Sequence, residues 1–286
     1  MPECGIVVPV RNEAAMLPKT VPLLLAAARA RAGIVWVCNG CTDTSAQVIR
    51  RLAGPSAEIV ELARPGKTLA LQAGDDALGD LFPRFYIDAD TTLGEAELAL
   101  LCAPLVAGTA DLVAPLLRFD STGASALSAA IGRCWMSLPH ARTAAFSNVI
   151  GVSSAARARW EQWPAIIGDD IFVSAMVPPL RKLIVTAATA TVAMPKTFDG
   201  WVTMRARWLK GEAQLAELGL AVPRAEGQRA ALMRQLLDPA VAPGAWAFLA
   251  ARCLAGLRPP AAGSHHWLPA RSGALADPPD RRFRCW

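Results

Sequence analysis

Two carboxylates stand directly after an apolar segment and could together hold a metal ion. The segment is Phe85-Tyr86-Ile87, and Asp88 and Asp90 follow it with one residue between them. At the end of a strand, two carboxylates with this spacing can share one hard divalent cation, which can in turn bridge a diphosphate. The same pattern also occurs as an ordinary turn with solvated acids. Asp88 and Asp90 are therefore candidate ligands of Mg²⁺ or Mn²⁺.

A second acidic pair, Asp169 and Asp170, precedes the apolar residues 171–173. Acids favour the first turn of a helix, so a helix is expected to begin here, with Asp169 as its N-cap. Adjacent carboxylates also raise one another's pKa, which suits a proton acceptor that works near neutral pH. The two interpretations are compatible.

Short strand and helix patterns alternate up to residue 90. Strands are expected at residues 6–10, 34–38, 58–62 and 85–87, and helices at 16–31, at 67–77, and through residue 52 after capping residues 42–45. This alternation predicts an α/β fold, a doubly wound and mostly parallel sheet with helices on both faces. Ligands bind such sheets at the carboxyl ends of the strands, where Asn39, Asp43 and Asp88 fall.

The rest of the chain is less regular and divides in two. We assign residues 1–110 to a nucleotide-binding half, 111–226 to an acceptor-binding and catalytic half of the same domain, and 227–286 to a C-terminal region. Further strands are expected at 112–116 and 183–193, and helices at 124–138, 170–177, 229–237 and 245–257. After Arg258 the sequence is rich in Pro, Ala, Gly and Arg without periodicity, which predicts a disordered tail.

Composition narrows the class of protein. The 286 residues are 53% hydrophobic and 19% charged, which suits one large domain or two closely packed halves. We find no apolar run of the roughly 18 residues that a membrane span requires, and no secretory signal pattern at residues 1–5. The seven cysteines are odd in number and scattered, which favours a reduced cytoplasmic setting. The net charge of +5 permits an anionic partner, but dispersed arginines and a single tyrosine do not favour nucleic acid.

Six short motifs in order carry a resemblance to a known family. The first four are Pro9-Val10-Arg11-Asn12-Glu13, Asn39-Gly40-Cys41-Thr42-Asp43, Gly66-Lys67-Thr68-Leu69-Ala70-Leu71 and Asp88-Ala89-Asp90. They resemble the donor-binding half of family 2 glycosyltransferases, which have the GT-A fold. Gly168-Asp169-Asp170 is similar to the acidic acceptor-side motif of that family, and Arg207-Trp208 to the end of its Q-x-x-R-W motif. The resemblance covers residues 5–213.

Four positions depart from the pattern of the family. Asn39 stands where the family usually has an Asp that reads the nucleotide base, and Cys41 replaces a Ser. Asp169 replaces a Glu, and Met204 stands at the position of the Gln. The full Q-x-x-R-W motif accompanies processive synthases with transmembrane helices. The resemblance therefore implies transfer of one sugar per encounter.

The resemblance also implies a role for each matching residue. Asp90 would be the main metal ligand, and Asp88 would contact the metal and the ribose or diphosphate. Asp170 would be the general base, which implies inversion of the anomeric centre. Arg207 would meet the diphosphate and Trp208 would line the acceptor site, although Arg207-Trp208 also fits one amphipathic helix face. The full set of implied donor-binding residues is Pro9, Arg11, Glu13, Asn39, Asp43, Lys67, Asp88, Arg207 and Trp208.

The expected partners follow from the same resemblance. They are a nucleotide-sugar donor, with a UDP-sugar expected, and a glycan or lipid-linked hydroxyl acceptor. We expect a cytoplasmic protein whose residues 245–257 either pack on the catalytic domain or lie along the inner face of the membrane.

Two other functions remain open at this point. One is a sugar nucleotidyltransferase, although the glycine-rich pyrophosphate loop of that class is missing after Val10. The other is a catalytically silent GT-A-like binding module, against which the retained Asp88, Asp90 and Asp170 argue.

Overall fold

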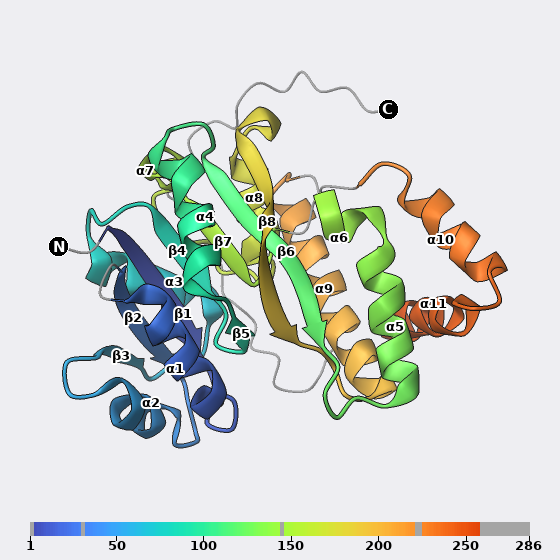
Figure 1. Cartoon of the computed structure of the whole chain (residues 1–286), viewed down its shortest axis with the longest axis horizontal. Helices are drawn as coiled ribbons and strands as arrows, with labels where there is room; N and C mark the ends of the chain where they lie inside the picture. Colours follow the sequence, from blue (N-terminus) through green and yellow to red (C-terminus); the bar gives the residue numbers. More distant parts are fainter. Residues whose placement is uncertain (1–2, 30–31, 144–145, 221–224, 258–286) are drawn as a thin grey trace.

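Eight strands form one sheet in the computed structural model, which describes residues 3–29, 32–143, 146–220 and 225–257. The strand order is β3-β2-β1-β4-β7-β6-β8-β5 (Figure 1). The predicted tail and His265-His266 lie outside the described residues. The strands are β1 (Cys4–Val10), β2 (Ala32–Asn39), β3 (Glu58–Leu62), β4 (Arg84–Ile87), β5 (Thr91–Thr92), β6 (Leu112–Asp120), β7 (Val149–Val152) and β8 (Lys182–Ala193).

Most neighbouring strands in the sheet are parallel. β3, β2, β1 and β4 pair in parallel, and so do β6 and β8. β7 is antiparallel to both β4 and β6, and β5 is antiparallel to β8. Because β7 reverses direction between β4 and β6, the carboxyl ends of β1, β2, β4, β6 and β8 all lie at the same edge. The predicted mostly parallel sheet is confirmed.

Helices cover both faces of this sheet, as expected for strands that are buried on both sides. Ile6, Val8 and Val10 of β1 belong to a core shared with α1, α2 and α4, whereas Val7 belongs to a core shared with α3 and α8. The helices are α1 (Leu17–Ala28), α2 (Ser45–Ala53), α3 (Lys67–Leu78), α4 (Glu95–Val106), α5 (Ala126–Ser137), α6 (Pro139–Thr143), α7 (Ser154–Arg157), α8 (Asp169–Met176), η1 (Pro179–Arg181), α9 (Phe198–Glu217), α10 (Gln228–Leu237) and α11 (Ala242–Leu257).

Seven elements have no counterpart among the predicted segments: α4, β5, α6, β7, α7, η1 and α9. β7 has only four residues, so no periodic pattern could reveal it. Its Gly151 is required by packing, because a Cβ there would lie 2.4 Å from a Phe85 ring carbon and 2.7 Å from a Val113 methyl group. Among the described helices, none combines the length and the apolar character that crossing a bilayer requires.

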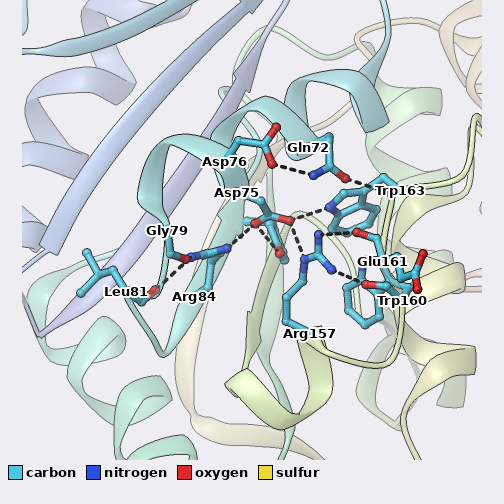
Figure 2. A network of polar contacts seen from close by, with 11 residues as sticks. Gln72, Asp75, Asp76, Gly79, Leu81, Arg84, Arg157, Trp160, Glu161 and Trp163 are labelled. Carbon is cyan, nitrogen blue, oxygen red and sulfur yellow. Dashed lines mark hydrogen bonds and ion pairs between the residues drawn. The ribbon is translucent and has the colours of Figure 1, made fainter.

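A buried carboxylate on α3 ties three segments of the chain together (Figure 2). Asp75 is 5% exposed. Its Oδ1 accepts hydrogen bonds from Arg84 Nη1 at 2.8 Å and Tyr86 Oη at 2.9 Å, both on β4. Its Oδ2 accepts from Arg157 Nε at 2.6 Å and Trp163 Nε1 at 2.8 Å. Asp75 therefore holds β4 and the segment 157–163 against α3.

The two arginines continue this network into the backbone. Arg84 also donates to the carbonyls of Gly79 and Leu81, and Arg157 donates to the carbonyl of Trp160. A buried arginine is costly unless its charge is paired and most of its donors have acceptors. Of the donors of Arg84, the Nε is buried without an acceptor. The segment 157–163 leads directly to α8, so the network fixes where α8 begins.

Replacing Asp75 with Ala should lower the free energy of unfolding by about 3–5 kcal/mol, because it leaves the buried charge of Arg84 unpaired. Urea unfolding followed by circular dichroism measures this loss. Asp76→Ala is the matched control, since Asp76 is exposed and bonds only Gln72 in the same network. Equal stability of the two variants would contradict the assignment.

Candidate active site

The loops after β1 and β2 are joined by hydrogen bonds at the carboxyl edge of the sheet. Asp43 accepts from the backbone amides of Ala14 and Ser45, both at 3.0 Å, and from Ser45 Oγ at 2.6 Å. Asn12, in the left-handed region with φ 56°, accepts from the Thr42 amide at 2.8 Å. Burial raises the pKa of Asp43, but the hydrogen bonds from Ser45 and Ala14 together outweigh burial and lower that pKa. Asp43 therefore fixes the loop that carries Glu13.

Asn39 joins the ends of β1 and β2 to the start of α3. Its side chain is buried at 3% exposure, donates to the Val10 carbonyl at 2.8 Å and accepts from the Gly66 amide at 3.0 Å. An Asp at this position could not donate to a carbonyl when ionised. The side chain of Asn39 therefore satisfies both a carbonyl and an amide at this place. Because Gly66 precedes Lys67, these hydrogen bonds also position Lys67.

Lys67 joins the two acidic pairs. It is the first residue of α3, and its Nζ lies 2.8 Å from Asp88 Oδ1 and 3.0 Å from Asp169 Oδ2. Burial opposes its charged form, but Asp169, Asp88 and Asp170 outweigh burial and raise the pKa of Lys67. The predicted metal pair and the predicted acid–base pair therefore share one ammonium group.

The carboxylates around Asp90 create a strongly negative region. Burial, and then the nearby Asp88, raises the pKa of Asp90 to about 6. Burial, and then Asp90, Asp43 and Asp88, raises the pKa of Glu13 to about 7. Such shifts mean that the groups resist losing their protons in the absence of a cation. A divalent cation at this place would relieve that repulsion.

The residues at this edge fit a metal that arrives with a diphosphate. In the described part of the chain, no three His, Cys, Asp or Glu side chains form a ready cage for a metal. Mg²⁺ and similar ions are commonly held by only one or two carboxylates, with phosphate oxygens and water completing the shell. Asp90 and Asp88 supply two such carboxylates. Asp88 is held in place by Lys67 and by Asn148, whose Nδ2 donates to its Oδ2 at 3.3 Å.

The helix after the second acidic pair begins differently from the prediction. Gly168 is the N-cap of α8, and Asp169 and Asp170 are its first two residues. Asp169 is therefore not the cap, because its buried carboxylate pairs with Lys67 instead. Burial raises the pKa of Asp169 against the opposing charge of Lys67. Burial, and then Asp169, raises the pKa of the half-buried Asp170 to about 7.

Arg207 and Trp208 lie on α9 in different surroundings. Gly211 of α9 packs on Gly168, since a Cβ at Gly211 would lie 3.1 Å from the Gly168 nitrogen. Arg207 is exposed one helical turn before Gly211, on the side of α9 that faces the start of α8. Trp208 packs instead on the ring of Trp135, with 5.9 Å between centroids. The two residues therefore do not act as one contact surface.

The other predicted residues, and several that were not predicted, also lie at the carboxyl edge of the sheet. Pro9 is buried within β1, and Arg11 is exposed just after it. Sequence patterns missed Asn148, whose positive φ of 62° suits an Asn but forms no motif. They also missed a hollow beside Asp90, which is closed by a 2.6 Å ion pair between Lys19 and Asp120. Its lining residues are Met16, Lys19, Thr20, Asp90, Thr92, Asp120, Thr191 and Ala193.

Comparison with known proteins identifies the fold. No protein-family model matches the chain, and no curated protein matches it by sequence. A mannosyltransferase from Pyrobaculum calidifontis, solved with GDP-Man and Mn²⁺, is similar in structure with TM-score 0.58 and 19% identity, covering 90% of this chain and 78% of that one. Glucosyl-3-phosphoglycerate synthase from Mycobacterium tuberculosis, solved with Mn²⁺, UDP-glucose and phosphoglyceric acid, has TM-score 0.52 and 17% identity, covering 78% and 81%. The chain therefore has the GT-A glycosyltransferase fold, as predicted.

Replacing Glu13 with Gln should stabilise the protein at pH 8 and change little at pH 4. The pKa of Glu13 is raised to about 7, so the folded state binds a proton more tightly than the unfolded state, and stability falls as pH rises from about 4.5 to 7. Gln removes this loss. Thermal unfolding without metal should show a Tm gain of roughly 2 °C at pH 8. Glu58→Gln, at an exposed position on β3, is the control, and equal gains for both would contradict the site assignment.

Proposed function

We propose that the chain is a glycosyltransferase that moves one sugar from a nucleoside-diphosphate sugar to a hydroxyl acceptor. The observation that carries this proposal is the meeting of Lys67, Asp88 and Asp169 at the carboxyl edge of the sheet. That edge carries the ammonium group of Lys67, a carboxylate pair suited to binding a metal, and a second carboxylate pair suited to proton transfer. The two similar structures are enzymes with Mn²⁺ and a nucleotide sugar bound.

The residues at this edge divide between the leaving group and the nucleophile. A nucleoside diphosphate gains negative charge as the bond to the sugar breaks, and Mn²⁺ or Mg²⁺ held by Asp90 and Asp88 would stabilise that charge. Lys67 lies beside Asp88 and supplies a further positive charge. Asn39 and Asp43 keep the loops around the nucleoside fixed through their hydrogen bonds. Arg207 is exposed near the start of α8, where it can reach a phosphate.

Asp170 is the proposed general base. Asp169 is buried and held by Lys67, whereas Asp170 is half-buried with a pKa raised to about 7. A carboxylate with this pKa is about half ionised near pH 7 and basic enough to take the proton of an attacking hydroxyl. One base with direct displacement inverts the anomeric centre.

The donor and acceptor classes follow from the family pattern. We propose a UDP-sugar as donor and a glycan or lipid-linked hydroxyl as acceptor, with transfer in the cytoplasm and contact with the inner face of the membrane.

Asp90→Ala should abolish release of nucleoside diphosphate from every donor, because it removes the main metal ligand without leaving a buried charge unpaired. A panel of nucleotide sugars with Mn²⁺, read by mass spectrometry, measures this. Asp80→Ala, at an exposed acid just after α3, should leave release unchanged. Full activity of Asp90→Ala in metal-free buffer would refute the metal assignment, and pyrophosphate release would indicate a nucleotidyltransferase. A chain that neither binds nor turns over any donor would be a silent module.

Asp170→Asn should lower turnover roughly 100-fold while donor binding persists, because the amide keeps the shape but cannot accept a proton. In the wild type, kcat/KM should rise with pH through about 7 as Asp170 loses its proton. Donor affinity from calorimetry and turnover from product release separate the two effects. If Asp169→Asn lowers turnover more than Asp170→Asn at unchanged affinity, the roles of the two carboxylates are exchanged.

A further inference from the structure

α10 and α11 form a helical hairpin at one end of the molecule, away from β3 and α2 (Figure 1). α11 packs on α5 and α9 through its small residues Gly244, Ala245, Ala251 and Ala255. The contact is close, because a Cβ at Gly244 would lie 2.5 Å from the Ala130 carbonyl oxygen. Gln235 of α10 donates to Ser137 at 2.8 Å, which fixes the second helix. The sides of both helices that face outward are therefore well defined.

The outward side of the hairpin is apolar. On α11, Trp246, Ala250, Leu254 and Leu257 are spaced three to four residues apart and are all exposed. Trp246 is 60% exposed and Leu257 is 79% exposed. Of the thirteen large hydrophobic side chains that are exposed in the described residues, six fall between 233 and 257. We call this surface the hairpin face; its members are Met233, Leu237, Val241, Trp246, Ala250, Leu254 and Leu257.

Basic side chains border the hairpin face. Arg229 and Arg234 of α10 are exposed near Met233 and Leu237, and Asp238 is the only acid in residues 227–257. Arg252 of α11 is also exposed but lies on the side toward α9, beside Trp201 and Trp208. The sequence that follows, 258–286, contains five arginines and two aspartates. Exposed Trp and Leu with surrounding Arg is the composition of helices that lie in a membrane interface. Isolated exposed apolar side chains are ordinary, but the exposed apolar residues of α11 recur every three to four positions and so line one side of that helix, which marks a contact surface.

We propose that the hairpin face binds the surface of an anionic lipid bilayer. A helix of 16 residues is about 24 Å long, short of the roughly 30 Å hydrocarbon core, so α11 would lie along the surface rather than cross it. Trp246 and the leucines enter the interfacial region, and the arginines meet the anionic headgroups.

Charge favours a lipid surface over the two other candidates for covering this face. A second copy of the chain paired through the same face would bring the arginines of both copies together, and like charges oppose that contact. The segment 258–286 is itself basic, so its charge also matches the arginines poorly. An anionic bilayer complements both the apolar centre and the basic border.

The position of the face has a consequence that rests on the proposed function. α11 packs on α9, and α9 carries Arg207 and contacts Gly168 before the acidic pair. A bilayer at the hairpin face would therefore be connected to the second half of the site through α11 and α9. A lipid contact on this half of the molecule suits an acceptor hydroxyl on a lipid carrier.

Sedimentation with vesicles tests the proposal without any donor, so its result is independent of glycosyl transfer. The full chain should pellet with vesicles of phosphatidylcholine and phosphatidylglycerol at low salt, and much less with phosphatidylcholine alone.

Trp246→Glu should lower the bound fraction at least tenfold, because it puts a charge at the centre of the face. Leu180→Glu is the matched control, since Leu180 is 96% exposed on η1, outside the hairpin, and should bind like the wild type. Arg234→Glu, at an exposed position beside Met233, should weaken binding to the anionic vesicles and reduce its dependence on salt.

Each other outcome overturns the proposal. A full chain that stays in the supernatant with anionic vesicles shows that the face does not bind lipid. Binding that Trp246→Glu leaves intact places the lipid contact elsewhere, such as in 258–286. A concentration-dependent dimer in gel filtration that Trp246→Glu disrupts, without vesicle binding, shows that a second copy covers the face. Unchanged circular dichroism spectra of the variants ensure that lost binding is not lost folding.

Discussion

The ion pairs of Lys67 hold the candidate site together. Asp88 follows β4 and Asp169 begins α8, so these carboxylates come from distant parts of the chain and would repel one another. The ammonium group lies within 3.0 Å of both and makes their approach favourable. Because Lys67 is the first residue of α3, its position depends on Asn39, which holds the preceding Gly66. The local geometry of one loop thus decides whether the two acidic pairs meet.

The same helix anchors the second half of the site by another route. Two turns after Lys67, Asp75 binds the arginines of β4 and of segment 157–163, and that segment runs to Gly168. α3 therefore fixes Asp169 from both sides, through its first residue and through its buried carboxylate. A buried charge network contributes little net stability, but it specifies one arrangement of the segments that it joins. Here that arrangement is the one that brings α8 to the carboxyl edge.

Much of the fold could be predicted from local pattern. The alternation of β1 to β4 with α1 to α3 was visible because the elements follow one another regularly and are bounded by turn, capping or motif residues. β7 was not visible, since its four residues pair only with strands distant in sequence. The site residues with motif neighbours were named, whereas Asn148 and Asp120 reach the site only through tertiary contacts. The assignment of Asp169 as a helix cap failed because the ammonium group of Lys67 offered it a stronger partner than the backbone amides.

The contact between Gly211 and Gly168 joins α9 to α8 backbone against backbone. Side chains between packed helices can change rotamer and absorb small movements, but two glycines have no side chains that could do so. Movement of α9 toward this point would therefore press on the backbone of Gly168, immediately before the acidic pair.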